Sequence, residues 1–259
     1  SDGVRTMSAR GRVSIYVVPA LVITAFAVFV FSESVQEITL TTLFPDEPEH
    51  IYTRSGLPQL LREHIVLVAV SSVAAALVGI SLGVFVTRPP GRDFLSVVQD
   101  LSSLAQTFPP VAVLALAVPA FGFGFTPTVV ALFIYSILPV LNNTISGMEG
   151  IPRELTDASR GIGMTKLQIL FLSELPLAAR VIAAGVRTSV IINIGTATVG
   201  AVVGAGGLGV IIIGGLVRDN VAFVFSGAMT AALFALIVDW VFSRAQSLFF
   251  APRARQEGP

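Results

Sequence analysis

The longest stretch without a charged side chain runs over residues 101–148, and it limits what this chain can fold into. Its 48 residues are about twice the roughly 20 that one membrane-spanning helix needs. Residues 122–127, with the sequence GFGFTP, favour a turn that divides the run in two. We therefore predict two spans here, the third and fourth of the chain. Both contain prolines that free backbone carbonyls, either as simple packing kinks or because the broken helices line a route through the membrane.

Four further apolar stretches have the length of membrane-spanning helices. They are residues 15–31, 65–87, 177–203 and 220–238. The first follows several arginines and is predicted to be a signal anchor, with a cleaved signal peptide as the alternative because Ser32, Glu33 and Ser34 form a small-x-small site. Six spans predict an all-α, polytopic membrane protein.

The composition agrees with this class and excludes several others. Of 259 residues, 54% are hydrophobic and only 12% charged, which leaves too little polar surface for a soluble domain of this length. The chain has no cysteine, and a formal net charge of zero gives no reason to expect nucleic-acid binding. Its two histidines, His50 and His64, lack the spacing of metal ligands, so we expect them to be solvated or interfacial and predict no metal site.

The basic residues predict the orientation in the membrane. With six spans and an inner N-terminus, the outer segments hold only Arg54, Arg62 and Arg218. The inner segments hold Arg5, Arg10, Arg12, Arg88, Arg92, Arg153, Arg160, Lys166, Arg180, Arg244, Arg253 and Arg255. Both termini and the polar loop at residues 147–176 are therefore expected in the cytoplasm of a cell whose plasma or inner membrane holds the chain.

The loop at residues 147–176 contains an ordered pattern of small and polar residues. Its members are Asp157, Ala158, Ser159, Gly163, Leu175 and Pro176. Small residues let a short helix approach a partner surface closely. Gly163 can supply a positive φ between two short helices, and Pro176 suits the first turn of the next helix. An ordinary amphipathic loop would show the same features.

This pattern resembles the loop of the permease subunits of binding-protein-dependent ABC importers, which reads Glu-Ala-Ala, three residues, Gly, nine residues, Ile, one residue, Leu-Pro. Three positions depart from it: Asp157 replaces Glu, Ser159 replaces Ala, and Ser173 stands in the place of Ile. Gly163 and the Leu175–Pro176 pair carry the likeness most firmly.

Other phrases resemble the permeases of osmoprotectant importers, which carry glycine betaine, choline, carnitine or related solutes. These phrases are QTFPP at residues 106–110, LPVLNNT at 138–144, GVRT at 185–188, NIGTAT at 193–198 and GAGGLG at 204–209. Permeases for methionine and phosphonate are similar in the loop and the last phrase, so they remain alternatives. The likeness covers about residues 57–247.

The resemblance implies a type I importer with a methionine-permease-like fold. It implies four kinds of partner: an ABC ATPase, a second permease subunit that is either this chain or a paralogue, an extracytoplasmic solute-binding protein, and the lipid bilayer. The sequence has no Walker A motif, so ATP and Mg²⁺ are expected on the ATPase and no cofactor on this chain. We expect three parts: the first span and an acidic outer loop (1–64), a permease core (65–247) and a cytoplasmic tail (248–259).

Several polar residues fall inside predicted spans and are candidates for the route of a solute. Arg187 lies about 15 Å along its helix from residue 177, at a rise of 1.5 Å per residue, so it should sit near the middle of the membrane. Such an arginine faces a water-filled cavity or a carboxylate, with Asp239 and Asp100 as the candidate partners. The uncharged candidates are Asn142, Asn143, Asn193, Thr196 and Thr198; hydrogen bonding between helices is the alternative role for each.

Four glycines follow the fifth predicted span: Gly204, Gly206, Gly207 and Gly209. Three of them satisfy G-x-G-x-x-G, but the apolar run before them is too long for the first strand of a dinucleotide-binding unit, and the acidic residue about 20 positions later is missing. We instead predict a tight turn at the outer face, followed by a short interfacial helix at residues 210–216.

Two other functional classes compete with an ABC permease. A secondary transporter would fit Arg187 and the broken helices, but it leaves the loop pattern unexplained and predicts an internal repeat that we do not find. An enzyme is disfavoured because the sequence contains no H-E-x-x-H, no G-x-S-x-G and no cysteine.

Overall fold

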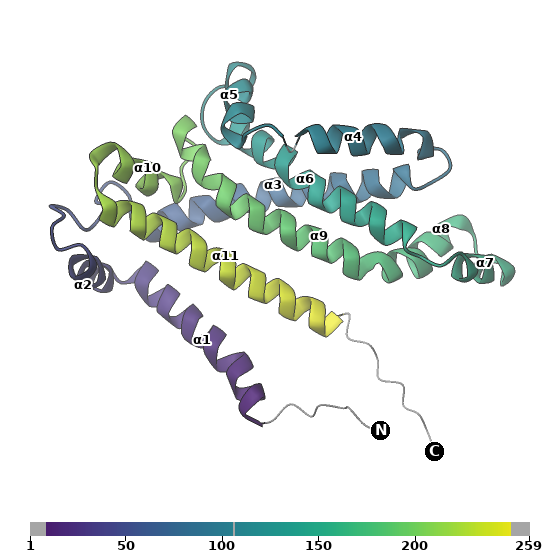
Figure 1. The fold of residues 1–259 in the computed structure, drawn as a ribbon, viewed down its shortest axis with the longest axis horizontal. Helices are drawn as coiled ribbons and strands as arrows, with labels where there is room; N and C mark the ends of the chain where they lie inside the picture. Colours follow the sequence, from purple (N-terminus) through teal and green to yellow (C-terminus); the bar gives the residue numbers. More distant parts are fainter. Residues whose placement is uncertain (1–8, 106, 250–259) are drawn as a thin grey trace.

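The regular elements of this computed structural model, which describes residues 9–105 and 107–249, are all helices (Figure 1). In chain order they are α1 (Ala9–Phe31), α2 (Glu33–Leu43), α3 (Leu57–Val86), η1 (Arg92–Phe94), α4 (Leu95–Ala105), α5 (Pro110–Phe121), α6 (Phe125–Glu149), α7 (Arg153–Gly161), α8 (Lys166–Gln168), η2 (Ile169–Glu174), α9 (Leu175–Thr196), η3 (Ala197–Val203), α10 (Gly209–Arg218) and α11 (Val221–Phe249). The predicted all-α fold is confirmed. Arg5, Gln106, Arg253 and Arg255 lie outside the described residues.

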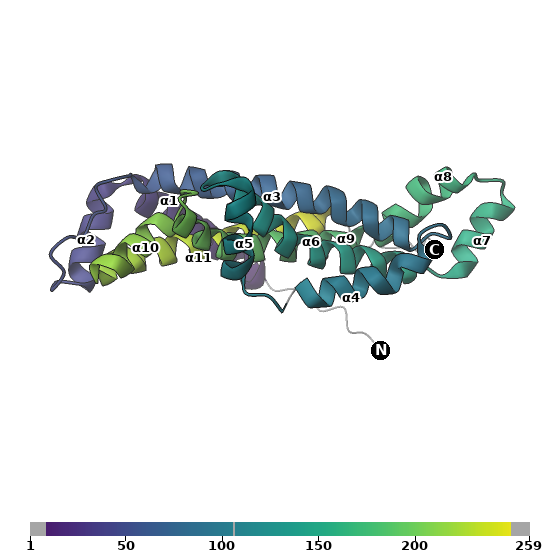
Figure 2. The ribbon, with the colours of Figure 1, turned by 90° about the horizontal axis from the view of Figure 1, so that it is seen from above.

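The long helices lie side by side, with α7 and α8 at one end of the molecule and α2 and α10 at the other (Figures 1 and 2). The helices α3, α6 and α9 form the centre. A Cβ on Gly79 would lie 3.0 Å from Val140, and one on Gly83 would lie 2.7 Å from Thr144, so these glycines bring α3 and α6 together. Their spacing of four residues is the small-xxx-small pattern that lets two helices approach closely.

Four helices are long and apolar enough to cross a membrane: Leu57–Val86, Phe125–Glu149, Lys166–Val203 and Val221–Phe249. A fifth crossing is added if α1 and α2, which meet at a bend of 97°, count as one span. Among the described residues the structure therefore has four or five such helices where we predicted six.

The predicted third span accounts for one missing helix, because it is divided into α4 and α5, of 11 and 12 residues. Pro109 is the N-cap of α5 and Pro110 its first residue. A proline has no N–H with which to continue the preceding helix, but it is favoured where a new helix starts. The predicted turn after α5 is confirmed, with Gly122 at φ 78° and Gly124 at φ 96°.

The segment predicted as a polar outer loop, residues 32–64, contains α2 and the first turns of α3. Pro58 lies in the first turn of α3, a position that suits proline because its missing N–H has no partner there. The acidic residues before it are tied to α11: Glu47 Oε1 accepts a hydrogen bond from the N–H of Val221 at 2.9 Å, and the carbonyl of Glu49 accepts one from Asn220 Nδ2 at 2.8 Å. A carboxylate is favoured at a helix N-terminus, where the backbone N–H groups lack partners.

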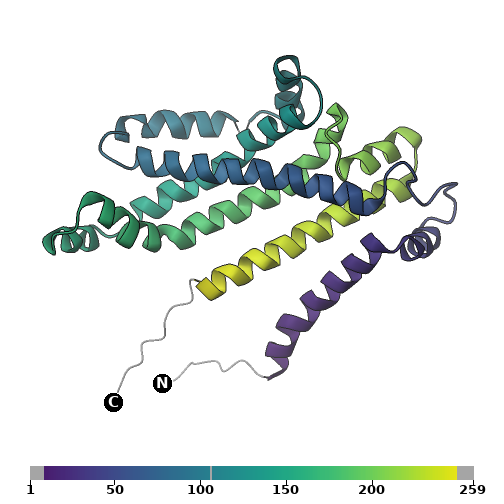
Figure 3. The ribbon, with the colours of Figure 1, turned by 180° about the vertical axis from the view of Figure 1, so that it is seen from behind.

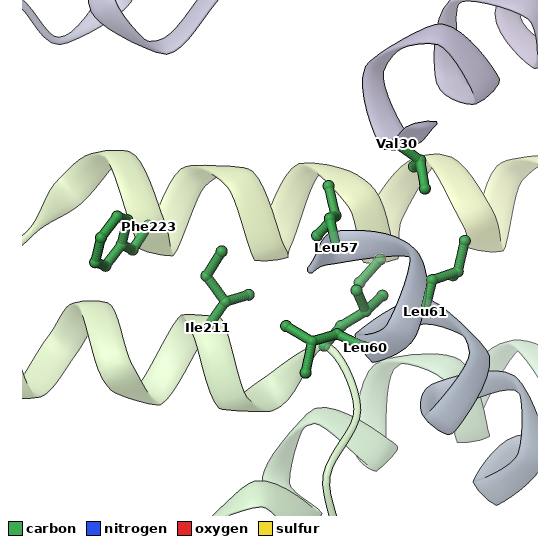
Figure 4. Packing of buried hydrophobic residues seen from close by; sticks show 8 residues of the cluster. Val30, Leu57, Leu60, Leu61, Ile211 and Phe223 are labelled. Carbon is green, nitrogen blue, oxygen red and sulfur yellow. The ribbon is translucent and has the colours of Figure 1, made fainter. Parts of the chain in front are cut away.

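The N-terminal helix α1 runs beside α11, as the view from behind shows (Figure 3). At the end of the bundle where α2 and α10 lie, a hydrophobic cluster joins α1, α3, α10 and α11 (Figure 4). It contains Val30, Leu57, Leu60, Leu61, Leu208, Ile211, Phe223 and Ala231. This cluster fixes the start of α3 against the connection that precedes α10.

Candidate functional site

The loop between α6 and α9 projects from one end of the bundle (Figures 1 and 2). Gly163 has φ 84° and turns the chain between α7 and α8, as predicted. Thr165 then caps α8 through a capping box: its side chain accepts from the N–H of Gln168, and the Gln168 side chain accepts from the N–H of Thr165. The turn at Gly163 and the start of α8 therefore take their shape from residues within the loop itself.

Apolar side chains of this loop point into solvent. Ile162 is 80% exposed and Leu167 is 68% exposed. Nearby, Asp157 forms an exposed ion pair with Arg160 at 3.0 Å, and the Ser159 hydroxyl donates to the carbonyl of Leu155. Apolar surface grouped on a projecting polar loop is typical of a binding face for another protein.

Behind the loop, the predicted Leu175–Pro176 pair stands at the start of α9. Leu175 packs on the buried cluster of Met148, Ala178 and Ile182, whereas Pro176 occupies the first turn, as predicted. Loop and span are thus joined without a flexible linker.

The joint also contains a π-helix, η2, which the sequence did not predict. Glu174 ends this segment, is 7% exposed, and pairs with Arg88 of the α3–α4 connection at 2.6 Å. A π-helix is rare and occurs frequently at functional sites. The only signal in the sequence is a charged residue placed directly before an apolar span.

In the middle of the bundle, Arg187 pairs with Asp239, one of its two predicted partners. The contact is bidentate, with Nε and Nη2 donating to the two carboxylate oxygens at 2.6 Å each. It joins α9 to α11, which continues past Asp239 to Phe249. Asp100, the other candidate, lies exposed on α4.

The uncharged candidates mostly bond within the bundle. Asn193 is fully buried and its amide donates to the hydroxyls of Ser71 and Ser72 on α3, at 3.0 and 2.9 Å. Asn143 donates to the carbonyl of Pro139 within α6, and Thr198 of η3 donates to the carbonyl of Gly195 at the end of α9. Asn142 and Thr196 are half-buried. The place of all five residues along a solute route stays a prediction.

The glycine turn at residues 204–209 lies at the end of the bundle opposite the α6–α9 loop, and it is a tight turn, as predicted. Gly204, Gly206 and Gly207 have φ of 77°, 84° and 78°. A Cβ on Gly209 would lie 1.9 Å from the carbonyl oxygen of Thr198. The short helix predicted at 210–216 is α10, Gly209–Arg218.

Two residues of α3 hold this turn, and sequence reasoning missed both. Glu63 Oε2 accepts a hydrogen bond from the N–H of Gly207 at 3.0 Å. His64 was expected to be solvated or interfacial, but it is fully buried and its Nε2 lies 2.9 Å from the carbonyl oxygen of Ile194. The expectation was wrong because α3 begins at Leu57, so His64 lies inside the helix on its buried face.

Comparison with known proteins identifies the family. Residues 75–255 match the model described as binding-protein-dependent transport system inner membrane component. The chain belongs to this family. As a permease subunit of an ABC transporter it is not itself catalytic, and it is a multi-pass membrane protein. The described residues contain no group of three His, Cys, Asp or Glu side chains that could hold a metal ion.

Several curated proteins are similar to this permease. The osmoprotectant import permease protein OsmY of Salmonella typhimurium is 42% identical over 178 residues, covering 69% of this chain and 75% of that protein. The choline transport system permease protein OpuBB of Bacillus subtilis is 39% identical over 184 residues, covering 71% and 84%.

The fold is similar to that of a solved transporter. A chain from inward-facing structures of the MetNI methionine ABC transporter matches this permease with a TM-score of 0.67 and 22% identity, covering 74% of this chain and 95% of that one. At this identity the likeness shows the fold alone, and it confirms the predicted methionine-permease-like architecture.

Proposed function

We propose that this permease forms the translocation pathway of an ATP-driven importer for small compatible solutes of the glycine betaine, choline and carnitine type. The observation that carries the proposal is its similarity, at 36–42% identity over 68–73% of the chain, to relatives named for osmoprotectant, choline, carnitine or glycine betaine transport. The methionine transporter is similar at 22% identity, which supports a shared fold but not a shared solute.

The projecting loop is the docking face for the ATPase. Its exposed apolar residues need a protein partner, and the small residues Ala158 and Ser159 allow close approach of the short α7. Because Leu175 anchors α9 in the buried cluster, a force on α7 and α8 acts directly on a span. Nucleotide binding and Mg²⁺ belong to the ATPase, since this chain has no Walker A motif.

The charged pair in the middle of the bundle supports a second permease subunit and a wet route. The side chains of Arg187 and Asp239 are 30% and 35% exposed in the single chain. Exposed charges in a membrane face water or another protein, because exposure to hydrocarbon is costly. We place this face of α9 and α11 toward the pathway that two permeases enclose, with both termini and the ATPase loop on the inner side.

Uptake by the reconstituted complex tests the proposal. Proteoliposomes would contain this permease and its ATPase, with its binding protein outside, and labelled glycine betaine, choline and methionine would be compared. We expect glycine betaine or choline to enter only with ATP inside. ATPase activity stimulated by a binding protein that is loaded with methionine, without betaine or choline uptake, would contradict the proposed solute class. The importer architecture would survive that result.

A further inference from the structure

Two neighbouring residues of α3 hold the two ends of one segment at the outer face of the permease. His64 contacts the carbonyl oxygen of Ile194, where α9 ends, and Glu63 accepts from the N–H of Gly207 in the glycine turn. Residues 194–207 between these contacts comprise the end of α9, η3 and most of the glycine turn. Both ends of the segment therefore contact the same turn of α3.

The contact at the first end is buried and directional. A carbonyl oxygen only accepts hydrogen bonds, so His64 Nε2 must carry a proton; in the neutral ring, Nδ1 then carries none. Ile194 lies in the last turn of α9, just before the helix changes to η3. A Cβ on Gly207 would lie 3.2 Å from His64 Nδ1, so glycine lets the turn lie directly on this ring.

The contact at the second end depends on a carboxylate. Glu63 Oε1 accepts from Gln59 Nε2 at 2.9 Å while Oε2 accepts from Gly207, so one side chain joins α3 to the turn. Successive backbone N–H groups in left-handed conformation form a concave site for an anion. Only glycine fits at position 206, where a Cβ would lie 2.5 Å from Glu63 Oε2.

The middle of the segment is held from the other side by the start of α6. The N–H of Gly124 donates to the carbonyl of Val203 at 2.7 Å, and Gly200 lies so close to Thr128 that a Cβ would be 2.5 Å from its methyl group. Beside the turn, a cavity of about 870 Å³ is lined by Glu63, Ala205 and Phe125 among others. The segment thus has free volume next to its second contact, whereas its middle is packed on the start of α6.

We infer that Glu63 and His64 are positioning residues that hold residues 194–207 as an outer gate, and that the contact of Glu63 with Gly207 opens when the ATPase binds ATP. This inference rests on the proposed function, because it assumes that solute arrives at the outer face. The turn moves into the neighbouring cavity while the middle of the segment stays on α6. These glycines were predicted only to form a turn, whereas in the structure Gly207 also bonds to Glu63 of α3.

Cysteine labelling tests the gate directly, because the native chain has no cysteine. In Ala205→Cys permease, assembled with its ATPase and binding protein, the rate of maleimide labelling would be measured without nucleotide and after trapping with ATP and vanadate. We expect labelling to be about tenfold faster in the trapped state, because loss of a charged hydrogen bond changes an equilibrium by about that factor. Equal rates in both states would overturn the inference.

Variants of α3 test whether Glu63 controls the opening of the gate or only stabilises the fold. With Ala205→Cys, Glu63→Ala should label rapidly even without nucleotide and should hydrolyse ATP without the binding protein. Glu63→Gln keeps an accepting oxygen and should restore much of the slow rate. Arg62→Ala, at the neighbouring residue that lines the same cavity, is the matched control and should behave as the parent. Slow, nucleotide-dependent labelling in Glu63→Ala would overturn the role of Glu63.

The proposed function and the gate can fail separately. If the Ala205→Cys complex imports glycine betaine or choline but its labelling ignores nucleotide, only the gate is wrong. If labelling follows nucleotide as expected but neither solute enters, the gate stands and the solute class is wrong.

Discussion

Two glycine turns lie at opposite ends of this permease, and they use glycine for different reasons. Gly163, in the inner loop, has φ 84°, and a Cβ built on it meets nothing within 4 Å. In the outer turn, Cβ atoms on Gly206 and Gly209 would lie 2.5 Å from Glu63 and 1.9 Å from Thr198. The inner turn needs glycine for its backbone conformation, whereas the outer turn also needs it for tertiary packing.

The difference matches the proposed roles of the two ends. A loop that docks on an ATPase must keep its surface free, so its shape has to come from local rules such as the positive φ of Gly163 and the capping box of Thr165. A gate has to open and close when the helices of the bundle move. Its conformation therefore has to depend on contacts with those helices. Substitutions should therefore change global stability at the outer end and coupling at the inner end.

Gly209→Ala should have the largest effect on stability. The added methyl group would meet a backbone carbonyl at 1.9 Å, which forces α10 away from η3. We expect the free energy of unfolding to fall by about 3 kcal/mol or more. Gly195→Ala is the matched control, since a Cβ there meets nothing within 4 Å and should change stability by less than about 0.5 kcal/mol. Thermal unfolding in detergent measures both; equal midpoints would show that the outer turn is not packed as described.

Asp239→Leu should have the second largest effect on stability. The ion pair with Arg187 joins α9 to α11, the two long helices that precede and follow the outer turn in the chain. Removal of the carboxylate leaves Arg187 without its partner, and we expect a loss of about 1–2 kcal/mol, between the values for exposed and buried pairs, because both side chains are partly exposed. Arg187→Leu combined with Asp239→Leu should lose less than the single change. The unfolding midpoints of both variants test this; a single variant as stable as the parent would mean that water alone satisfies Arg187.

Gly163→Ala should have the smallest effect on stability and a large one on coupling. A left-handed alanine costs roughly 1–2 kcal/mol, but the loop is exposed, so it can rearrange locally while the midpoint for the bundle stays unchanged. ATP hydrolysis stimulated by loaded binding protein should fall by about tenfold. Gly161→Ala, also open to solvent but with no positive φ, is the control and should retain stimulation. Full stimulation of Gly163→Ala would refute the role of the turn.

The sequence predicted best where a feature depends on near neighbours in the chain. The apolar runs gave α3, α6, α9 and α11, and Gly163 and Pro176 were placed correctly because turn and first-turn rules are local. It failed at Pro109–Pro110, inside the predicted third span, because a proline can break a helix or begin one. The choice between these roles depends on the position of the next helix.

The role of His64 illustrates what was missed and what signal existed. Leu60, Leu61, His64, Leu67, Val68 and Ser71 recur at helical spacing, which places His64 and Ser71 on the buried face of α3. That periodicity predicts burial but does not predict contact partners. The partners of Glu63, His64 and Asn193 lie 121 to 144 residues away in the chain, and no local rule could find them.

The sequence by itself determined that this is a helical membrane protein, which family its inner loop resembles, and where the chain turns. These properties follow from hydrophobic run lengths, backbone preferences and charge bias, all of which act over a few residues. Only the tertiary structure decided that Asp239 pairs with Arg187 and that Glu174 pairs with Arg88. It also decided that α3 contacts both ends of residues 194–207. Such contacts depend on which helix faces join, and that is settled by the packing of the whole bundle.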